Sequence, residues 1–264
     1  MRPSITHYSL GSAPASGVGI GVAADELNAA LSSSVANTVF DDFGMGAVRE
    51  LLGGLADTEF VRDNLNALLN EDAAPEDWRI GEAIAECYLT ENRECHFPWP
   101  DGRDERKRGS SLPGADLVGF QRENGEDRFA FGEVKTSSHA AYPPGTVFGR
   151  HGLKQQMEDL RDKREIRDGL VRYLGHRAIN STWRDRYETA GARYLRNTSD
   201  VRLHGILVRD VPPNQDDLRV RVQKLAVDCP PATVIELTAI YLPSGRIPTL
   251  ANSAVDARRN RGAT

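Results

Sequence analysis

The sequence predicts an α/β (α+β) fold in which helices flank a mixed central sheet, and two observations lead to that prediction. Four short segments rich in Val, Ile, Leu and Phe show the apolar runs and alternation typical of strands: 115–121, 128–136, 201–209 and 233–242. The segments between and before them have apolar residues at three- and four-residue steps, the spacing of an amphipathic helix. Because strands and helices alternate along the chain, we expect helices on both faces of the sheet.

Four regions are expected along the chain. Residues 1–24 are rich in Gly, Ala and Ser, which predicts a flexible N-terminus. Residues 25–76 have leucines at helical spacing and form an N-terminal helical extension. Residues 77–244 form the core, and residues 245–264 are polar and Arg-rich, as in a mobile tail. Within the core the helices are expected at 77–92, 152–174, 184–195 and 215–226.

The composition excludes several classes of protein. Of the 264 residues, 39% are hydrophobic and 27% charged, and no apolar run approaches the roughly 20 residues of a membrane span. The N-terminus lacks the basic start and the apolar stretch of a signal peptide, so we expect a cytoplasmic protein with no membrane association. The three cysteines show no Cys-x-x-Cys spacing, which disfavours a structural zinc site or a disulfide framework.

Charge is unevenly distributed. Residues 1–100 hold 16 Asp and Glu against 5 Arg and no Lys, whereas the remainder holds 28 basic and 22 acidic residues, so the net charges are −11 and +6. Residues 150–196 contain 12 Lys or Arg and 7 Asp or Glu. Because phosphate contacts dominate nucleic-acid affinity, this region is a candidate contact surface.

The aromatic residues of 150–196 could stack on bases or pack in the core: Tyr173, Trp183, Tyr187 and Tyr194. The charged run 103–108 is expected to be a solvated loop or a phosphate-contacting one.

A hairpin is predicted where two strand segments flank Asn124-Gly125, because Asn-Gly is a strong signal for a tight hairpin turn. With that turn, Phe120 faces Phe129 and, four residues further from the turn on each strand, Asp116 faces Glu133. Lys135 lies two residues beyond Glu133 and therefore projects from the same face of its strand.

Two opposed carboxylates in a hairpin destabilise it unless their charge is offset, because the side chains lie about 4.5–5.5 Å apart at Cβ. A divalent cation offsets it, and oxygen ligands suit Mg²⁺ or Mn²⁺. Lys135 at the rim could orient or deprotonate a water, or offset charge on a phosphate. The alternative is an ion pair of Lys135 with Glu133 or Asp116 at a strand end. Glycoside hydrolysis also uses two carboxyls, but it has no need of the lysine.

Asp116 followed by Glu133-Val134-Lys135 resembles the motif of the PD-(D/E)XK nuclease family. The resemblance implies a restriction-endonuclease-like core, a metal held by the Asp and Glu, and a lysine that assists the attacking water. The proline that precedes the Asp in the family is not in place, because Gly114-Ala115 precede Asp116 here.

The family often adds a carboxylate from the helix before the hairpin and a glutamine on the helix after it. Glu82, which follows Gly81, is the favoured carboxylate, and Glu86 on the next turn is the alternative. Gln156 lies between Leu153 and Leu160 on an apolar stripe, where a buried amide needs a polar partner. Gln155 is its alternative. His139 and His151 flank the loop after Lys135 and could approach the site.

Residues 131–137, 201–210 and 235–242 look like those of the nuclease subunit of the Hachiman antiphage system, over about Trp78 to Leu242. This narrower resemblance implies a Mg²⁺-dependent deoxyribonuclease that works with a partner helicase. Two alternatives stay open. The chain could be a non-catalytic module of the same fold that binds DNA or regulates a helicase, or a stand-alone restriction-type endonuclease.

Overall fold

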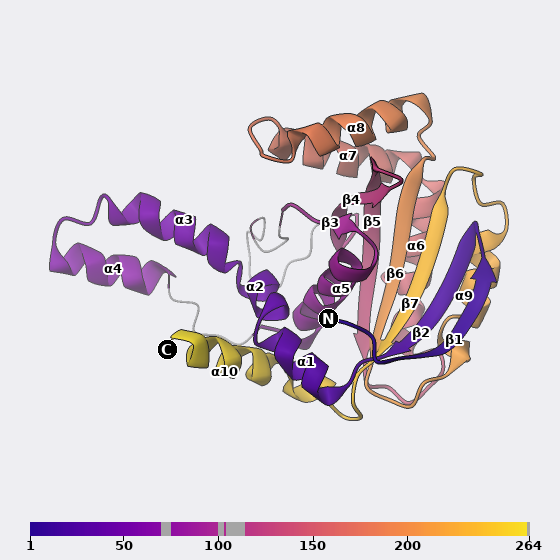
Figure 1. The fold of residues 1–264 in the computed structure, drawn as a ribbon, viewed down its shortest axis with the longest axis horizontal. Helices are drawn as coiled ribbons and strands as arrows, with labels where there is room; N and C mark the ends of the chain where they lie inside the picture. Colours follow the sequence, from indigo (N-terminus) through magenta and orange to yellow (C-terminus); the bar gives the residue numbers. More distant parts are fainter. Residues whose placement is uncertain (70–74, 100–102, 104–113, 263–264) are drawn as a thin grey trace.

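The computed structural model describes residues 1–69, 75–99, 103 and 114–262. It confirms an α/β fold with a mixed seven-stranded sheet of order β1-β2-β7-β6-β5-β4-β3 (Figure 1). The strands are β1 (Ile5–Ser12), β2 (Ala15–Gly21), β3 (Cys95–His96), β4 (Leu117–Glu123), β5 (Glu126–Ser137), β6 (Val201–Arg209) and β7 (Val234–Tyr241). The three pairs from β2 through β7 and β6 to β5 are parallel, and the outer pairs are antiparallel.

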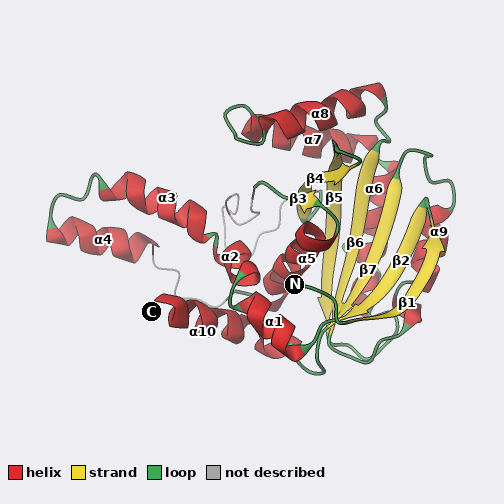
Figure 2. Cartoon of the chain, in the orientation of Figure 1, coloured by secondary structure: helices red, strands yellow, loops and turns green. Residues whose placement is uncertain are grey.

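Helices cover both faces of the sheet (Figure 2). On one face lie α1 (Ala24–Leu31), α2 (Ser34–Phe40), α5 (Asp77–Asn92) and α10 (Leu250–Gly262). On the other lie α6 (Leu153–Asp162), α7 (Arg164–Ala178), α8 (Arg184–Arg196) and α9 (Arg219–Ala226). The two faces bury separate apolar clusters, because successive residues of each strand point to opposite sides. None of the described helices is both long and apolar enough to cross a membrane.

The predicted flexible N-terminus is wrong: residues 5–12 and 15–21 form the hairpin β1–β2, and β2 pairs with β7. Glycines weakened the strand signal here, and packing explains them. A Cβ built on Gly19 would lie 2.3 Å from the ring of Tyr8, so the tyrosine occupies the space that a β2 side chain would fill. The sheet therefore extends well outside the predicted core of residues 77–244.

The predicted mobile tail 245–264 is also different, because residues 250–262 form α10. Leu250 and Ala254 are fully buried in the cluster that contains α1, α2 and α5. Two apolar side chains one turn apart are enough to dock this otherwise polar helix. The single helix expected at 152–174 is two helices that break at Lys163, where buried Arg167 donates hydrogen bonds to the carbonyls of Leu160 and Arg161, both at 2.6 Å.

The N-terminal helical extension, predicted at 25–76, divides into two parts. Helices α1 and α2 pack on the sheet, whereas α3 (Asp42–Gly53) and α4 (Glu59–Leu69) project from the body as an arm (Figure 1). Every residue of α3 is described and none is buried. Leu51, Leu55 and Phe60 are 72–73% exposed, an unusual state for large apolar side chains that lie so close together.

Candidate active site

The hairpin β4–β5 has the predicted register. Phe120 pairs with Phe129, and the turn residues Asn124 and Gly125 have φ of 52° and 82°. Positive φ at both positions is what a type I′ turn requires, and Asn-Gly provides it at low cost. The ladder extends to Leu117 opposite Gly132, so Asp116 is the first residue beyond it. One more step of the same register places Asp116 opposite Glu133.

Asp116 is attached to β5 through its side chain. The backbone N–H of Val134 donates a hydrogen bond to Asp116 Oδ2 at 2.8 Å. The carboxylate thereby accepts the hydrogen bond that a backbone carbonyl of β4 would accept if the strand continued. The neighbouring strand β3 pairs only with residues 120 and 121 of β4. The start of β4 therefore lies at an edge of the sheet that β3 leaves open, and Asp116 lies there.

Lys135 joins the two carboxylates. Its Nζ donates a hydrogen bond to Glu133 Oε1 and lies 3.8 Å from Asp116 Oδ2. The side chain of Glu133 is completely buried, that of Asp116 is 10% exposed and that of Lys135 is 20% exposed. The structure thus brings together the three residues of the motif, with the ammonium as the most exposed of the three groups.

The other oxygen of Glu133, Oε2, is buried and has no hydrogen-bond partner among the described residues. Burial and the neighbouring charge of Asp116 raise the pKa of Glu133 well above its ordinary value, and Lys135 offsets only part of this. Burial alone would lower the pKa of Lys135, but the charges of Asp116, Glu133 and Glu82 outweigh it and raise that pKa. A carboxyl group in this state is stabilised either by a proton or by a cation.

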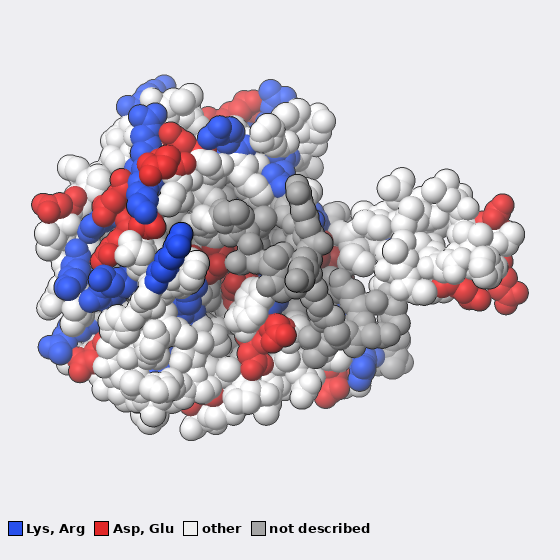
Figure 3. Space-filling view, turned by 180° about the vertical axis from the view of Figure 1, so that it is seen from behind, with Lys and Arg blue, Asp and Glu red and all other residues white. Residues whose placement is uncertain are grey.

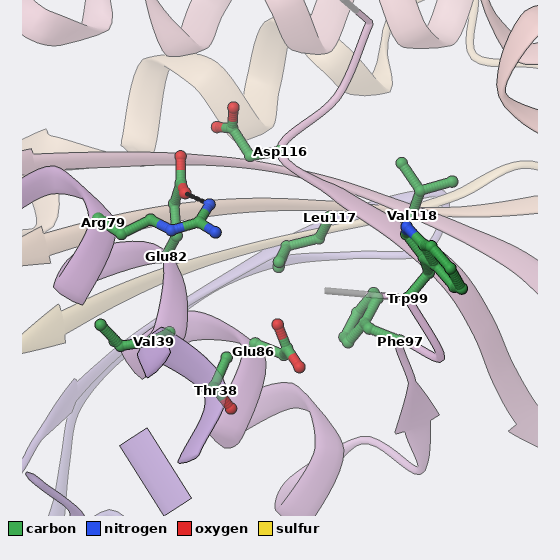
Figure 4. A pocket seen from close by; sticks show the side chains of 11 residues that line it. Thr38, Val39, Arg79, Glu82, Glu86, Phe97, Trp99, Asp116, Leu117 and Val118 are labelled. Atoms are coloured by element: carbon green, nitrogen blue, oxygen red, sulfur yellow. Dashed lines mark hydrogen bonds and ion pairs between the residues drawn. The ribbon is translucent and has the colours of Figure 1, made fainter. Parts of the chain in front are cut away.

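Helix α5 brings further carboxylates to the same edge. Glu82 and Glu86 line a small pocket together with Asp116, Leu117 and Val118 (Figure 4). Glu82 is buried, and Arg79 Nη1 lies 3.4 Å from its Oε2. Glu82 is the glutamate of this pair whose charge raises the pKa of Lys135. These observations favour Glu82 over Glu86 as the helical carboxylate.

Gly81 sets how closely α5 approaches the sheet. A Cβ built there would lie 1.8 Å from Thr136 Oγ1 and 3.1 Å from its Cβ, so a larger residue fits only if Thr136 rotates and the helix moves slightly. Gly81 was expected only to precede Glu82, and its packing role was not predicted. The Arg-x-x-Glu spacing from Arg79 to Glu82 is a signal for an ion pair on one helix face, and it was not used in the prediction.

The two glutamines of α6 differ. Gln155 Nε2 donates a hydrogen bond to Asp159 Oδ1 at 2.8 Å, whereas Gln156 Oε1 is buried without a partner in the described part of the chain. Helix α6 covers the face that holds Phe129 and Phe131, and Glu133 and Lys135 continue that odd-numbered series. Gln156 is therefore the better candidate, with an amide that still needs a polar group.

The remaining predicted residues do not join the site. His139 is exposed and its Nδ1 accepts a hydrogen bond from the backbone of Ala141, and His151 is also exposed. Of the aromatic residues in 150–196, Trp183, Tyr187 and Tyr194 pack against Phe120 or Phe129 in the core. Apart from Arg103, the charged run 103–108 lies outside the described residues.

A divalent cation fits the donors at this edge in chemistry, because Asp116, Glu133 and Glu82 offer hard carboxylate oxygens and one of these is buried without a partner. In the described residues, however, no three acidic, His or Cys side chains lie close enough together to hold one ion. Asp116 and Glu133 would be the primary donors, and Glu82 lines the same small pocket as Asp116. Comparisons of the chain with protein-family models and with curated proteins find no match.

Proposed function

We propose that this chain is a metal-dependent nuclease of the PD-(D/E)XK type that hydrolyses phosphodiester bonds in DNA. One observation supports this more than any other: a fully buried glutamate with an unpartnered oxygen lies beside a second carboxylate and beneath a lysine at an open sheet edge. Burial of two carboxyl groups there is costly in the absence of a compensating cation. An ion pair of Lys135 that served only to stabilise the fold would need one carboxyl group and not two.

Each residue has a distinct part in the proposed reaction. Asp116 and Glu133 would hold Mg²⁺ or Mn²⁺, with Glu82 completing or steadying the shell. The ion would polarise the phosphate and lower the pKa of a bound water. Lys135, held between Glu133 and Asp116, orients the attacking water or offsets charge on the phosphate. Gln156 orients the lysine or a phosphate oxygen.

The charge distribution supports DNA as the substrate. On the face that Figure 3 shows, Lys and Arg are spread over the body among Asp and Glu, whereas the visible part of the arm is mostly uncharged with Asp and Glu at its tip. Residues 41–69 hold 6 acidic and 2 basic residues. An anionic polymer is therefore repelled by the arm, and residues 101–264, with 28 basic and 22 acidic residues, are the part that attracts it.

We assign a protein partner to the arm, namely the helicase that the Hachiman-like resemblance implies, in a cytoplasmic antiphage system. The exposed apolar side chains of α3 and α4 support this, since a two-helix hairpin without a buried core gains most of its stability by docking. Co-purification with a helicase encoded beside this chain, and loss of that co-purification in Leu51→Glu/Leu55→Glu, would support the assignment. Robust, unregulated cleavage at a defined site without any second protein would favour a restriction-type endonuclease instead.

A cleavage assay tests the nuclease proposal. Purified chain is incubated with labelled single- and double-stranded DNA, and with RNA, in Mg²⁺, Mn²⁺ or EDTA. We expect metal-dependent cutting that falls by at least about 10²-fold in Glu133→Gln and in Lys135→Ala, because each removes a group that acts on the transition state. Glu126→Gln, on the same strand but 57% exposed at its side chain, is the matched control and should cut normally. Equal cutting by all four proteins would assign the activity elsewhere, and DNA binding without any cutting would favour the non-catalytic module.

A further inference from the structure

A second, larger pocket opens beside the candidate active site, between the start of β4 and helix α7. Its volume is about 520 Å³ and its lining is mainly apolar. Its lining includes Ala115, Val118, Ile166, Gly169, Leu170 and Tyr173. Pockets of roughly 300–1,000 Å³ are the size that takes small organic groups.

This pocket adjoins the carboxylates. Ala115 directly precedes Asp116 in the chain, and Val118 lines both this pocket and the small one that contains Asp116 and Glu82. A group bound in the larger pocket therefore lies next to whatever is bound at Asp116. For a nucleic acid, that arrangement places one base in the pocket when its phosphate is at the metal donors.

Gly169 lines the pocket from an exposed position of α7, and no packing contact requires a glycine there. It lies inside helix α7, where glycine is about 1 kcal/mol less favourable than alanine. A Cβ built there would meet no atom within 4 Å among the described residues. By contrast, a Cβ on Gly175 of the same helix would lie 2.6 Å from the hydroxyl of Tyr187. Gly175 is a packing glycine, whereas Gly169 leaves open space in the pocket wall.

Tyr173 of the pocket lining is linked by cation–π contacts to Trp99 of the small pocket. Arg177 Cζ lies 3.6 Å from the centre of the Tyr173 ring and 5.3 Å from that of Trp99, and Arg103 Cζ lies 5.0 Å from Trp99. Trp99 in turn lines the small pocket of the active site. Aromatic rings and guanidinium planes are the surfaces on which proteins stack unpaired bases, and arginines also contact the phosphates that flank a base.

We propose that the pocket binds an unpaired nucleobase next to the scissile phosphate, so that the preferred substrate is single-stranded, frayed or otherwise unpaired nucleic acid. The apolar lining, which includes Ile166, Leu170 and Tyr173, takes the face of the base. A base within a duplex must first be unstacked and unpaired, which disfavours intact double strands. The inference deepens the proposed nuclease function and rests on it for the position of the phosphate.

Binding in EDTA tests the pocket apart from any catalysis. The probes are a fluorescein-labelled oligothymidylate, a labelled oligonucleotide of the same length with abasic sites, and a labelled duplex, all measured by fluorescence anisotropy. Gly169→Leu fills the pocket from an open position and favours the helix. We expect it to weaken binding of the oligothymidylate by about 5- to 100-fold, the loss of roughly one stacked base, and to leave the abasic probe unaffected.

Two variants serve as controls. Gly169→Ala strengthens the helix but leaves most of the pocket open, and Gly191→Leu makes the same change in α8, where a Cβ likewise meets no described atom within 4 Å. Both should bind all probes as the wild type does. Thermal unfolding should show all three variants at least as stable as the wild type, so that weak binding by Gly169→Leu is not a folding defect.

The outcomes separate this inference from the proposed function. Equal binding of natural and abasic single strands by the wild type, or unchanged binding by folded Gly169→Leu, overturns the base pocket even if the chain cuts DNA. A base-dependent loss of binding in Gly169→Leu supports the pocket even if no metal-dependent cleavage is found. Tighter binding of the duplex than of the oligothymidylate by the wild type also overturns it.

Discussion

Replacing Gly81 by alanine tests how the contact between α5 and β5 places Glu82. The new Cβ would lie 1.8 Å from Thr136 Oγ1 and 3.1 Å from its Cβ. Rotation of Thr136 about χ1 relieves the first contact but not the second. If the threonine does not rotate, α5 has to shift by about 1.6 Å to restore an ordinary contact of 3.4 Å.

The expected free-energy change combines two opposite effects. Alanine favours the helix by about 1 kcal/mol, whereas overpacking of a buried contact costs about 1–3 kcal/mol. A clash this short lies at the upper end of that range, so Gly81→Ala should lower the free energy of unfolding by about 1–2 kcal/mol. The same helix-favouring change in Gly191→Ala meets open space and should raise it by up to about 1 kcal/mol.

Urea unfolding of Gly81→Ala and Gly191→Ala measures the sign of each change in the free energy of unfolding. The double variant Gly81→Ala/Thr136→Ala tests whether the contact with Thr136 causes the loss of stability. Removing Oγ1 and Cγ2 of Thr136 should recover part of the lost stability, which gives a coupling energy between the two positions. Cleavage should fall in Gly81→Ala, because the shift moves Glu82 away from Asp116. A Gly81→Ala variant as stable as Gly191→Ala, with full activity, would refute the claim that this close contact positions the helix.

Three further predictions concern separate parts of the molecule. Mg²⁺ or Mn²⁺ should raise the melting temperature of the wild type, by about 5–10 °C at a hundredfold excess over Kd, and should leave that of Glu133→Gln unchanged; equal shifts in differential scanning fluorimetry would refute the site. Burial, with the charge of Arg93, lowers the pKa of His204 to about 3 from 6.5, so only the unfolded chain takes up this proton as the pH falls below 6.5. The free energy of unfolding should therefore fall by about 2 kcal/mol from pH 7 to pH 5 through this group, and urea titrations of His204→Gln should lack that part of the loss. Leu51→Glu/Leu55→Glu should change the free energy of unfolding by less than about 0.5 kcal/mol, since both side chains are exposed, and a larger loss in urea would show that the arm packs on the body.

The hairpin could be predicted residue by residue because its determinants are local. Asn124 and Gly125 accept positive φ, and that turn alone fixes which residues of β4 and β5 face each other. Alternation along the strand then places Glu133 and Lys135 on one face. One feature of the hairpin could not be predicted from the local sequence. Asp116 contacts β5 through its side chain and not through its backbone.

The N-terminal strands could not be predicted, because their stability comes from neighbours that are distant in the sequence. β2 pairs with β7, more than two hundred residues away, and its glycines make room for side chains of β1. Neither fact leaves a periodic signal in residues 15–21. The sequence favoured Glu82 over Glu86 only because it follows Gly81, whereas the physical reason is the place where Gly81 lets α5 meet β5.

The arrangement of the site explains why its charges are tolerated in a buried position. Glu133 lies on a central strand between β4 and β6, so it cannot move toward water without breaking the sheet. Asp116 is fixed by the amide of Val134, and Glu82 by a helix that is held against Thr136. Three carboxyl groups on three rigid elements cannot spread apart to relieve their repulsion, and Lys135 and Arg79 supply two positive charges against them. A divalent cation at this edge would supply the missing positive charge. The same rigid arrangement that makes the site costly for folding would then hold the carboxylates ready to bind the metal.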